Sequence, residues 1–150
     1  MINLDFAGKV VLVTGASRGI GKAIASAFAA LNATVIGTAT SESGAQAITE
    51  YLGGKGHGMV LNSLEPATFA DFVKAVEEKA GGTVDILVNN AGITRDNLFM
   101  RMKDEEWDQV ISCNLTAVSK LCQLCMRGMM KKRNGRIINM HTKKTVDESL

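Results

Sequence analysis

Proline, cysteine and aromatic residues are scarce in this chain of 150 residues, which has one Pro, three Cys and 5% Phe, Trp and Tyr. Three cysteines are too few, and odd in number, for a disulfide scaffold, which favours a reducing compartment. The formal net charge of +2 is too small to indicate nucleic-acid binding. The hydrophobic content of 46%, with 15 Gly that follow no collagen-like repeat, excludes a disordered or fibrous chain. The composition therefore predicts one folded domain.

No segment looks like a membrane or export signal. Asp5 precedes the first apolar run and the start is not basic, unlike a signal peptide. Residues 23–41 carry no charge, but Asn32 and Gly37 interrupt them and their periodicity changes from helical to extended. That change is typical of a buried helix followed by a buried strand. We expect a cytoplasmic protein that does not contact a membrane.

Short β-branched apolar runs, typical of buried parallel strands, alternate with helical patterns along the chain. The runs predict strands at residues 9–14, 34–38, 58–62, 84–89 and 136–140. Helical spacing and end signals predict helices at residues 20–31, 43–52, 66–80 and 104–133. This alternation predicts an α/β, Rossmann-type doubly wound parallel sheet in the order 3-2-1-4-5. Such a sheet binds its ligand at the carboxyl ends of its strands.

Apolar side chains at offsets of three and four predict which face of each helix is buried. In the first helix this face is Ile20, Ala23, Ile24, Ala27, Phe28 and Leu31, and in the second it is Ala47, Ile48 and Leu52. In the third helix it is Phe69, Phe72, Val73, Val76 and Ala80. In the long helix it is Trp107, Val110, Ile111, Leu115, Val118, Leu121, Cys122 and Cys125.

Residues 14–21, here called the glycine turn, read Thr-Gly-Ala-Ser-Arg-Gly-Ile-Gly and lie between the first strand and the first helix. Gly15, Gly19 and Gly21 allow a tight turn, close approach of a diphosphate and close packing of helix on strand, while the helix N-terminus supplies partial positive charge. In this context the pattern predicts a dinucleotide site. The alternative is a turn that only starts the helix.

The predicted second strand ends without an acidic residue. A site for NAD usually places a carboxylate there, about 20 residues after the glycines, to bind the ribose hydroxyls. Residues 37–40 instead read Gly-Thr-Ala-Thr, and Arg18 could bind a 2′-phosphate bidentately, which favours NADP(H). Two alternatives stay open: Glu42 could reach a ribose, and Arg18 could be a solvated surface charge.

Asn-Asn-Ala-Gly at residues 89–92 ends the predicted fourth strand. Together with the glycine turn, it resembles the short-chain dehydrogenase/reductase family, whose signatures are TGxxxGxG and NNAG. Residues 37–42, 92–98, 100–107 and 129–133 are similar to the bacterial 3-oxoacyl-[acyl-carrier-protein] reductases within that family. The resemblance covers roughly residues 7 to 140. We therefore expect a dinucleotide-binding Rossmann domain over residues 1–140 and a divergent polar tail over residues 141–150.

The resemblance implies NADPH-dependent reduction of a 3-oxoacyl thioester to its 3-hydroxyacyl form in fatty-acid synthesis. It also implies contacts to the cofactor from Gly15, Ala16, Ser17, Arg18, Gly19, Ile20, Gly21, Thr40, Asn62, Ser63, Asn90, Ala91 and Gly92. Ser63 is a departure, because the family usually has an aliphatic residue there. Asn114 matches the catalytic Asn that helps to hold a relay water, with a hydrogen bond between helices as the alternative. In the resembled family, basic residues in the region of Arg133 help to dock acyl carrier protein, which makes Arg133 a candidate partner residue. We also expect a homo-oligomer or association through the long helix.

The sequence departs from the family after Asn139. The family continues with a catalytic Ser and a Tyr-x-x-x-Lys helix, whereas Met-His-Thr-Lys-Lys follows here at residues 140–144. Thr142 keeps a hydroxyl near the position of the serine, and the one Tyr in the chain is Tyr51. General acid catalysis contributes roughly 10²–10⁴-fold, so we expect a chain truncated relative to the family, with turnover that is very weak or absent.

Two other functions stay open. One is a non-catalytic NADP(H)-binding protein that pairs with a full-length reductase, and the other is an S-adenosylmethionine-binding domain, which usually requires an acid after the second strand. Cys122 and Cys125 are spaced like a redox pair but lie well inside a predicted helix, so we expect a core role for them. His57 and His141 have no partner at metal spacing, so no metal site is expected.

Overall fold

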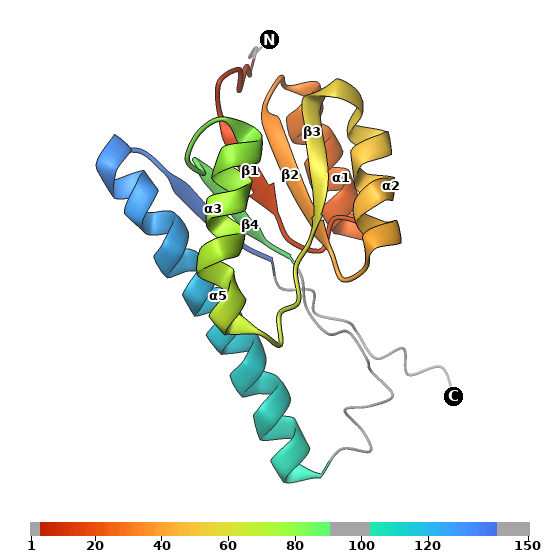
Figure 1. The fold of residues 1–150 in the computed structure, drawn as a ribbon, viewed down its shortest axis with the longest axis vertical. Coiled ribbons are helices and arrows are strands. Elements are labelled where there is room, and N and C mark those ends of the chain that lie inside the picture. The colour runs from red at the N-terminus through yellow and green to blue at the C-terminus, as the bar shows by residue number, and fades with distance from the viewer. Residues whose placement is uncertain (1–3, 91–102, 141–150) are drawn as a thin grey trace.

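A five-stranded parallel sheet forms the centre of the computed structural model, which describes residues 4–90 and 103–140, the side chains of residues 107 and 109–114 excepted. Its order is β3-β2-β1-β4-β5 (Figure 1). The strands are β1 (Val10–Val13), β2 (Thr34–Ala39), β3 (Gly56–Val60), β4 (Ile86–Asn89) and β5 (Arg136–Asn139). The predicted α/β class and strand order are therefore confirmed.

Helices follow the strands as the alternation predicts. They are α1 (Gly19–Ala30), α2 (Glu42–Leu52), α3 (Phe69–Ala80) and α5 (Asp104–Lys132), with short 3₁₀ helices η1 (Gly53–Lys55) and η2 (Pro66–Thr68). The predicted third helix thus starts as 3₁₀ and becomes α-helical at Phe69. None of these helices is long and apolar enough to span a membrane.

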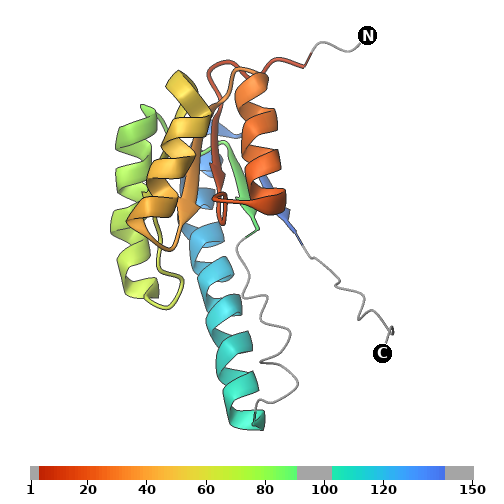
Figure 2. The ribbon, with the colours of Figure 1, turned by 90° about the vertical axis from the view of Figure 1, so that its right-hand side faces the viewer.

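The two faces of the sheet carry separate hydrophobic cores because β1 alternates its side chains between them. Val11 and Val13 face α1 and α2, which stand side by side in Figure 2. Val10 and Leu12 face α3 and α5. The central strands are therefore covered on both sides, which explains their nearly continuous apolar runs.

The structure corrects the predicted buried face of α1. Gly21, Ala25 and Ala29, spaced by four, are buried, whereas Ile20 is 47% exposed and Ala23 is also exposed. Only small side chains fit between α1 and the sheet at this close approach. The larger Phe28 and Ile24 lie at the margin of the contact, where Phe28 packs edge-on against Phe6 with ring centroids 5.5 Å apart.

Corrections of the same kind apply to α2, α5 and β3. In α2 Ile48 and Leu52 are buried as predicted, together with Ala45, whereas Ala47 is exposed. Among the α5 side chains that the structure describes, Leu115 is 62% exposed and the buried ones are Ala117, Leu121, Cys125 and Met129. The predicted burial of Trp107, Val110 and Ile111 lies outside the described side chains. Strand β3 begins at Gly56, two residues before the predicted start, because Gly56 and His57 have no apolar side chain to mark it. The first turns of α5 project beyond the rest of the described chain (Figure 1).

Candidate functional site

The glycine turn follows β1 at the carboxyl edge of the sheet, and hydrogen bonds to β2 fix its first part. The Gly15 N–H donates to Thr38 Oγ1 at 3.2 Å, and the Ala16 N–H donates to the Thr38 carbonyl oxygen at 2.8 Å. Thr38 is 2% exposed. Its hydroxyl is therefore an internal partner of the turn and is not presented to a ligand.

Asn90 ties the end of β4 to the same turn. Its Nδ2 donates to the Gly15 carbonyl oxygen at 3.2 Å, and its backbone N–H donates to Thr14 Oγ1 at 3.0 Å. The structure thus brings together the glycine turn and the first part of the predicted Asn-Asn-Ala-Gly motif. Through these contacts, Asn90 acts as a support for the turn, whatever else its amide binds.

The N-terminus of α1 presents backbone donors beside the turn. The Lys22 N–H donates to the Arg18 carbonyl oxygen and is the first intrahelical bond. The N–H groups of Gly19, Ile20 and Gly21 precede it, so they have no partner inside the helix. These donors, together with the positive end of the helix dipole, are suited to an anion.

Two glycines make the turn tight on one side and open on the other. A Cβ at Gly21 would overlap the Gly15 carbonyl oxygen and would lie 2.6 Å from Asn90 Nδ2. Gly19 has φ +61°, and a Cβ there would meet nothing within 4 Å. Only glycine therefore fits at position 21, while position 19 leaves room for a ligand to approach the backbone.

Arg18, Ser17 and Thr40 lie where the first two strands end. Arg18 is the exposed N-cap of α1 and Thr40 is exposed directly after β2. Ser17 lies beside the start of α2, since a Cβ at Gly44 would be 3.7 Å from the Ser17 Cβ. The one ion pair among the described residues joins Lys132 and Asp85, so no carboxylate there neutralises Arg18. The exposed Glu42 lies in the first turn of α2.

Asn62 and Ser63 follow β3 at this edge, but their described contacts are local. The Leu64 N–H donates to Asn62 Oδ1 at 3.0 Å and the Glu65 N–H donates to the Asn62 carbonyl oxygen at 3.1 Å. This is an Asx turn that shapes the loop. The cofactor contacts predicted for both residues stay predictions.

Four predicted site residues cannot be placed in the same way. Ala91, Gly92 and Thr142 lie outside the described residues, and for Asn114 the structure describes only a backbone within α5. Their predicted roles stay predictions. Arg133 is exposed at the C-terminal end of α5.

Tyr51, which sequence patterns missed, and Asn89, the first residue of the Asn-Asn-Ala-Gly motif, hold the site in place. Tyr51 of α2 donates its hydroxyl to the Ala16 carbonyl oxygen at 2.6 Å. Buried Asn89 donates to Asn139 Oδ1 at 3.0 Å and to Cys122 Sγ at 3.4 Å, which links β4 to β5 and α5. The Asn-Asn-Ala-Gly motif at the end of β4 was the signal for Asn89. No local signal marks Tyr51.

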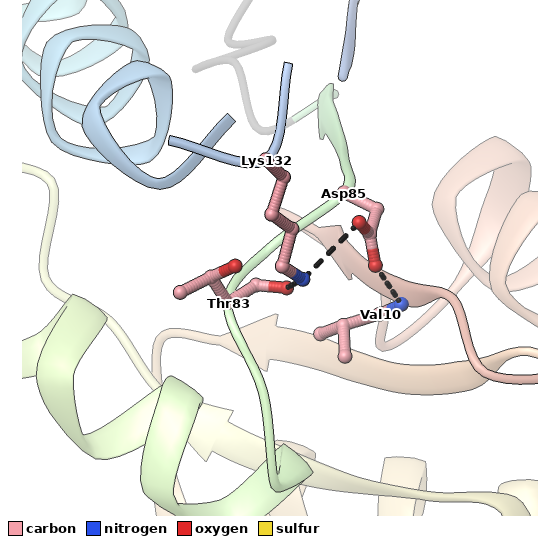
Figure 3. A network of polar contacts seen from close by, with 4 residues as sticks. All are labelled: Val10, Thr83, Asp85 and Lys132. Atoms are coloured by element: carbon pink, nitrogen blue, oxygen red, sulfur yellow. Dashed lines mark hydrogen bonds and ion pairs between the residues drawn. The ribbon is translucent and has the colours of Figure 1, made fainter. Parts of the chain in front are cut away.

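A second network lies at the opposite, N-terminal ends of the strands, where β1 and β4 begin (Figure 3). Asp85 is 4% exposed; its Oδ2 accepts the Val10 N–H at 2.8 Å and its Oδ1 lies 3.3 Å from Lys132 Nζ. Lys132 Nζ also donates to the Thr83 carbonyl oxygen at 3.0 Å. These bonds join β1, the start of β4 and the end of α5, so this edge is structural.

The cysteines support the expected core role. Cys125 is 2% exposed, and burial, then the Cys122 thiol and the Glu77 carboxylate, raise the pKa of its thiol to about 12. A thiol with so high a pKa is a poor nucleophile. Within the described part of the chain, no three His, Cys, Asp or Glu residues are grouped to hold a metal ion.

Comparisons with known proteins agree with this geometry. The family model for short chain dehydrogenases matches residues 9–149. The chain is 59% identical over 137 residues to the 3-oxoacyl-[acyl-carrier-protein] reductase FabG of Escherichia coli, covering 91% of this chain and 56% of that protein. It is 61% identical over 137 residues to that of Vibrio cholerae, with the same coverage, and 50% identical over 140 residues to that of Pseudomonas aeruginosa, again covering 91% and 56%.

The chain thus spans about half the length of the curated relatives it matches. The matched residues nevertheless include the glycine turn, the hydrogen bonds of Asn89 and Asn90 at the end of β4, and those of Asp85 at its start. They also include all five strands of the described sheet, from Val10 to Asn139. On this evidence, the chain belongs to the short chain dehydrogenase family.

Proposed function

We propose that this chain binds NADP(H) at the carboxyl edge of the sheet, as the coenzyme-binding part of a 3-oxoacyl-[acyl-carrier-protein] reductase. The observation that carries the proposal is the glycine turn, with backbone donors at Gly19, Ile20 and Gly21 beside an open approach at Gly19. The names of the relatives supply the substrate class.

Each part of the turn has a role in holding the coenzyme. The free N–H groups of α1 and its dipole bind the diphosphate. The exposed guanidinium of Arg18 binds the 2′-phosphate, which no carboxylate of β2 repels, since residues 34–39 are Thr-Val-Ile-Gly-Thr-Ala. When bound, NADPH supplies the hydride for reduction of a 3-oxo group.

Further roles within this function come from the family resemblance. Asn114 is proposed to hold a water in the proton relay, Thr142 to contribute a hydroxyl, and the basic surface at Arg133 to dock acyl carrier protein. Thr40, Asn62 and Ser63 are proposed to contact the adenosine half of the coenzyme, and Ala91 and Gly92 to line its path beside β4. Copies of the chain are proposed to associate through α5.

A second candidate is coenzyme binding without turnover. It is favoured by Tyr51, the one tyrosine of the sequence, whose phenol already donates to the Ala16 carbonyl oxygen. A phenol held there within α2 is not available to protonate a substrate. The two candidates share the coenzyme site and differ in whether the bound coenzyme is oxidised.

The test is an NADPH titration followed by reduction of an acetoacetyl thioester, using the full chain. Arg18→Ala should weaken NADPH roughly 10- to 150-fold, because a charge-assisted hydrogen bond contributes about 1.5–3 kcal/mol, and should leave NADH almost unchanged. Arg127→Ala, which removes an exposed arginine from α5, is the matched control.

Binding with oxidation supports the reductase, and binding without oxidation supports the second candidate. If folded wild-type protein binds neither NADPH nor NADH, both candidates are wrong. If Arg18→Ala weakens NADPH and NADH equally, the assignment of the 2′-phosphate to Arg18 is wrong.

A further inference from the structure

Tyr51 links three segments around the coenzyme turn. It lies in the last turn of α2, and its hydroxyl donates to the Ala16 carbonyl oxygen at 2.6 Å, 35 residues earlier in the chain. On α1, Lys22 Nζ lies 5.1 Å from the centre of the Tyr51 ring. A cation at this distance is attracted to the ring face, which further restricts the orientation of the phenol.

The hydrogen bond fixes the direction of one peptide group in the turn. In a trans peptide the C=O and the following N–H point in opposite directions, and no described peptide bond is cis. Because the Ala16 C=O points to Tyr51, the Ser17 N–H of the same peptide points away from Tyr51. No described residue accepts a hydrogen bond from that N–H.

The preceding peptide is held differently. This is the peptide between Gly15 and Ala16. Its carbonyl oxygen, on Gly15, accepts a hydrogen bond from Asn90 Nδ2, and its N–H, on Ala16, donates to the Thr38 carbonyl oxygen. Both of its polar groups are therefore used inside the protein. The peptide between Ala16 and Ser17 is held on one side only, by Tyr51, which leaves its N–H for a ligand.

We propose that Tyr51 is a positioning residue for the coenzyme: its phenol orients the peptide between Ala16 and Ser17 so that the Ser17 N–H faces a phosphate group of NADP(H). The proposal rests on the proposed function, because it adds a fourth backbone donor to the three of α1. Without the phenol, this peptide can rotate and turn its carbonyl oxygen toward the anion. Tyr51 is thus a support for binding and does not touch the coenzyme itself.

The protonation state of Tyr51 suits this role. Burial raises the pKa of its phenol above the ordinary value of 10.0. The group therefore stays an O–H donor at neutral pH.

Tyr51→Phe removes the hydroxyl and keeps the ring under Lys22. Thr49→Val is the matched control, since Thr49 is also on α2 and its hydroxyl donates to Ala45 O at 3.1 Å and accepts the Gly58 N–H at 2.9 Å. Neither contact of Thr49 reaches the glycine turn. Both variants lose a hydroxyl of α2, but only the first should lose affinity for the coenzyme.

We expect Tyr51→Phe to raise the Kd for NADPH about 2- to 10-fold, the worth of one hydrogen bond, and Thr49→Val to leave it within 2-fold. Amide NMR supplies the second measurement: NADPH should shift the Ser17 N–H resonance in the wild-type chain, and shift it less in Tyr51→Phe. An effect on stability alone would not change the Ser17 shift at saturating NADPH.

The inference is overturned if wild type binds NADPH and Tyr51→Phe binds it equally well, or if Thr49→Val weakens binding as much. A Ser17 resonance that NADPH leaves unmoved in the wild-type chain overturns it too. If the wild-type chain itself does not bind NADPH, the proposed function is wrong and this inference with it.

Discussion

Replacing Asp85 with Ala removes both bonds of a carboxylate whose side chain is 6% exposed (Figure 3). The Val10 N–H then loses its acceptor inside the sheet edge, and Lys132 loses its partner. A hydrogen bond to a charged group contributes about 1.5–3 kcal/mol. The ion pair adds up to about 1 kcal/mol, because Lys132 is 40% exposed.

The expected loss for Asp85→Ala is therefore about 2–4 kcal/mol of the free energy of unfolding, a large part of the stability of an ordinary domain. Asp85→Asn keeps one oxygen to accept the Val10 N–H but places its amide NH2 toward Lys132, so it loses only the ion pair and should cost about 1 kcal/mol. Urea unfolding followed by far-UV circular dichroism measures both. Glu78→Ala, an exposed carboxylate on α3, is the control and should stay within about 0.5 kcal/mol of wild type.

Two results would refute this reasoning. If Asp85→Asn is as destabilising as Asp85→Ala, the charge and not the bond to Val10 carries the effect. If Asp85→Ala costs less than about 1 kcal/mol, the buried N–H finds another partner, and the network of Figure 3 is not what joins this edge.

Three further predictions concern other sites. Gly21→Ala should lower the free energy of unfolding by about 1–3 kcal/mol and abolish NADPH binding, because the new Cβ overlaps the Gly15 carbonyl oxygen. Gly54→Ala, which places its Cβ in open space, should behave as wild type; urea unfolding and coenzyme titration test both variants. Cys125 should resist iodoacetamide at about pH 8, since raising its pKa from 9.0 to about 12 lowers the thiolate fraction about 1000-fold; rapid labelling in the folded chain, mapped by mass spectrometry, would contradict this. Because burial raises the pKa of Tyr51, its contribution to stability is complete below its unfolded pKa, 10.0, and is lost as pH rises through the higher folded pKa. The fall of the urea midpoint above about pH 10 should therefore be smaller in Tyr51→Phe than in wild type, while the part that comes from Cys125 stays the same in both.

The sequence predicted most of the strands because β1, β2 and β4 are apolar runs between turn signals, and it predicted their order from the alternation of strands and helices. The start of β3 was missed because Gly56 and His57 give no such signal. The sequence also predicted the glycine turn, because the residues that form it are contiguous and make a recognisable motif. Local patterns could also place Asn90 near the turn, because parallel strands end at one edge of the sheet.

Other features depend on distances that a local pattern does not contain. The prediction of the buried face of α1 was wrong because the close packing of this helix on the sheet selects small residues such as Ala25 over large ones such as Ile20. Tyr51 and Ala16 are 35 residues apart, and Asp85 and Val10 are 75 apart. Their pairing follows from the assembled sheet, so only the structure could show it.

The neighbours of β1 also imply an order of assembly. In β2, Thr34 pairs with Val10, 24 positions earlier, whereas in β4, Ile86 pairs with Val11, 75 positions earlier. Closing the longer loop costs about 1 kcal/mol more in chain entropy, so the β1-α1-β2 crossover unit, whose strands are parallel, should form first during folding. The glycine turn then acquires its bonds to Thr38 early and its bond to Asn90 late, when β4 inserts beside β1.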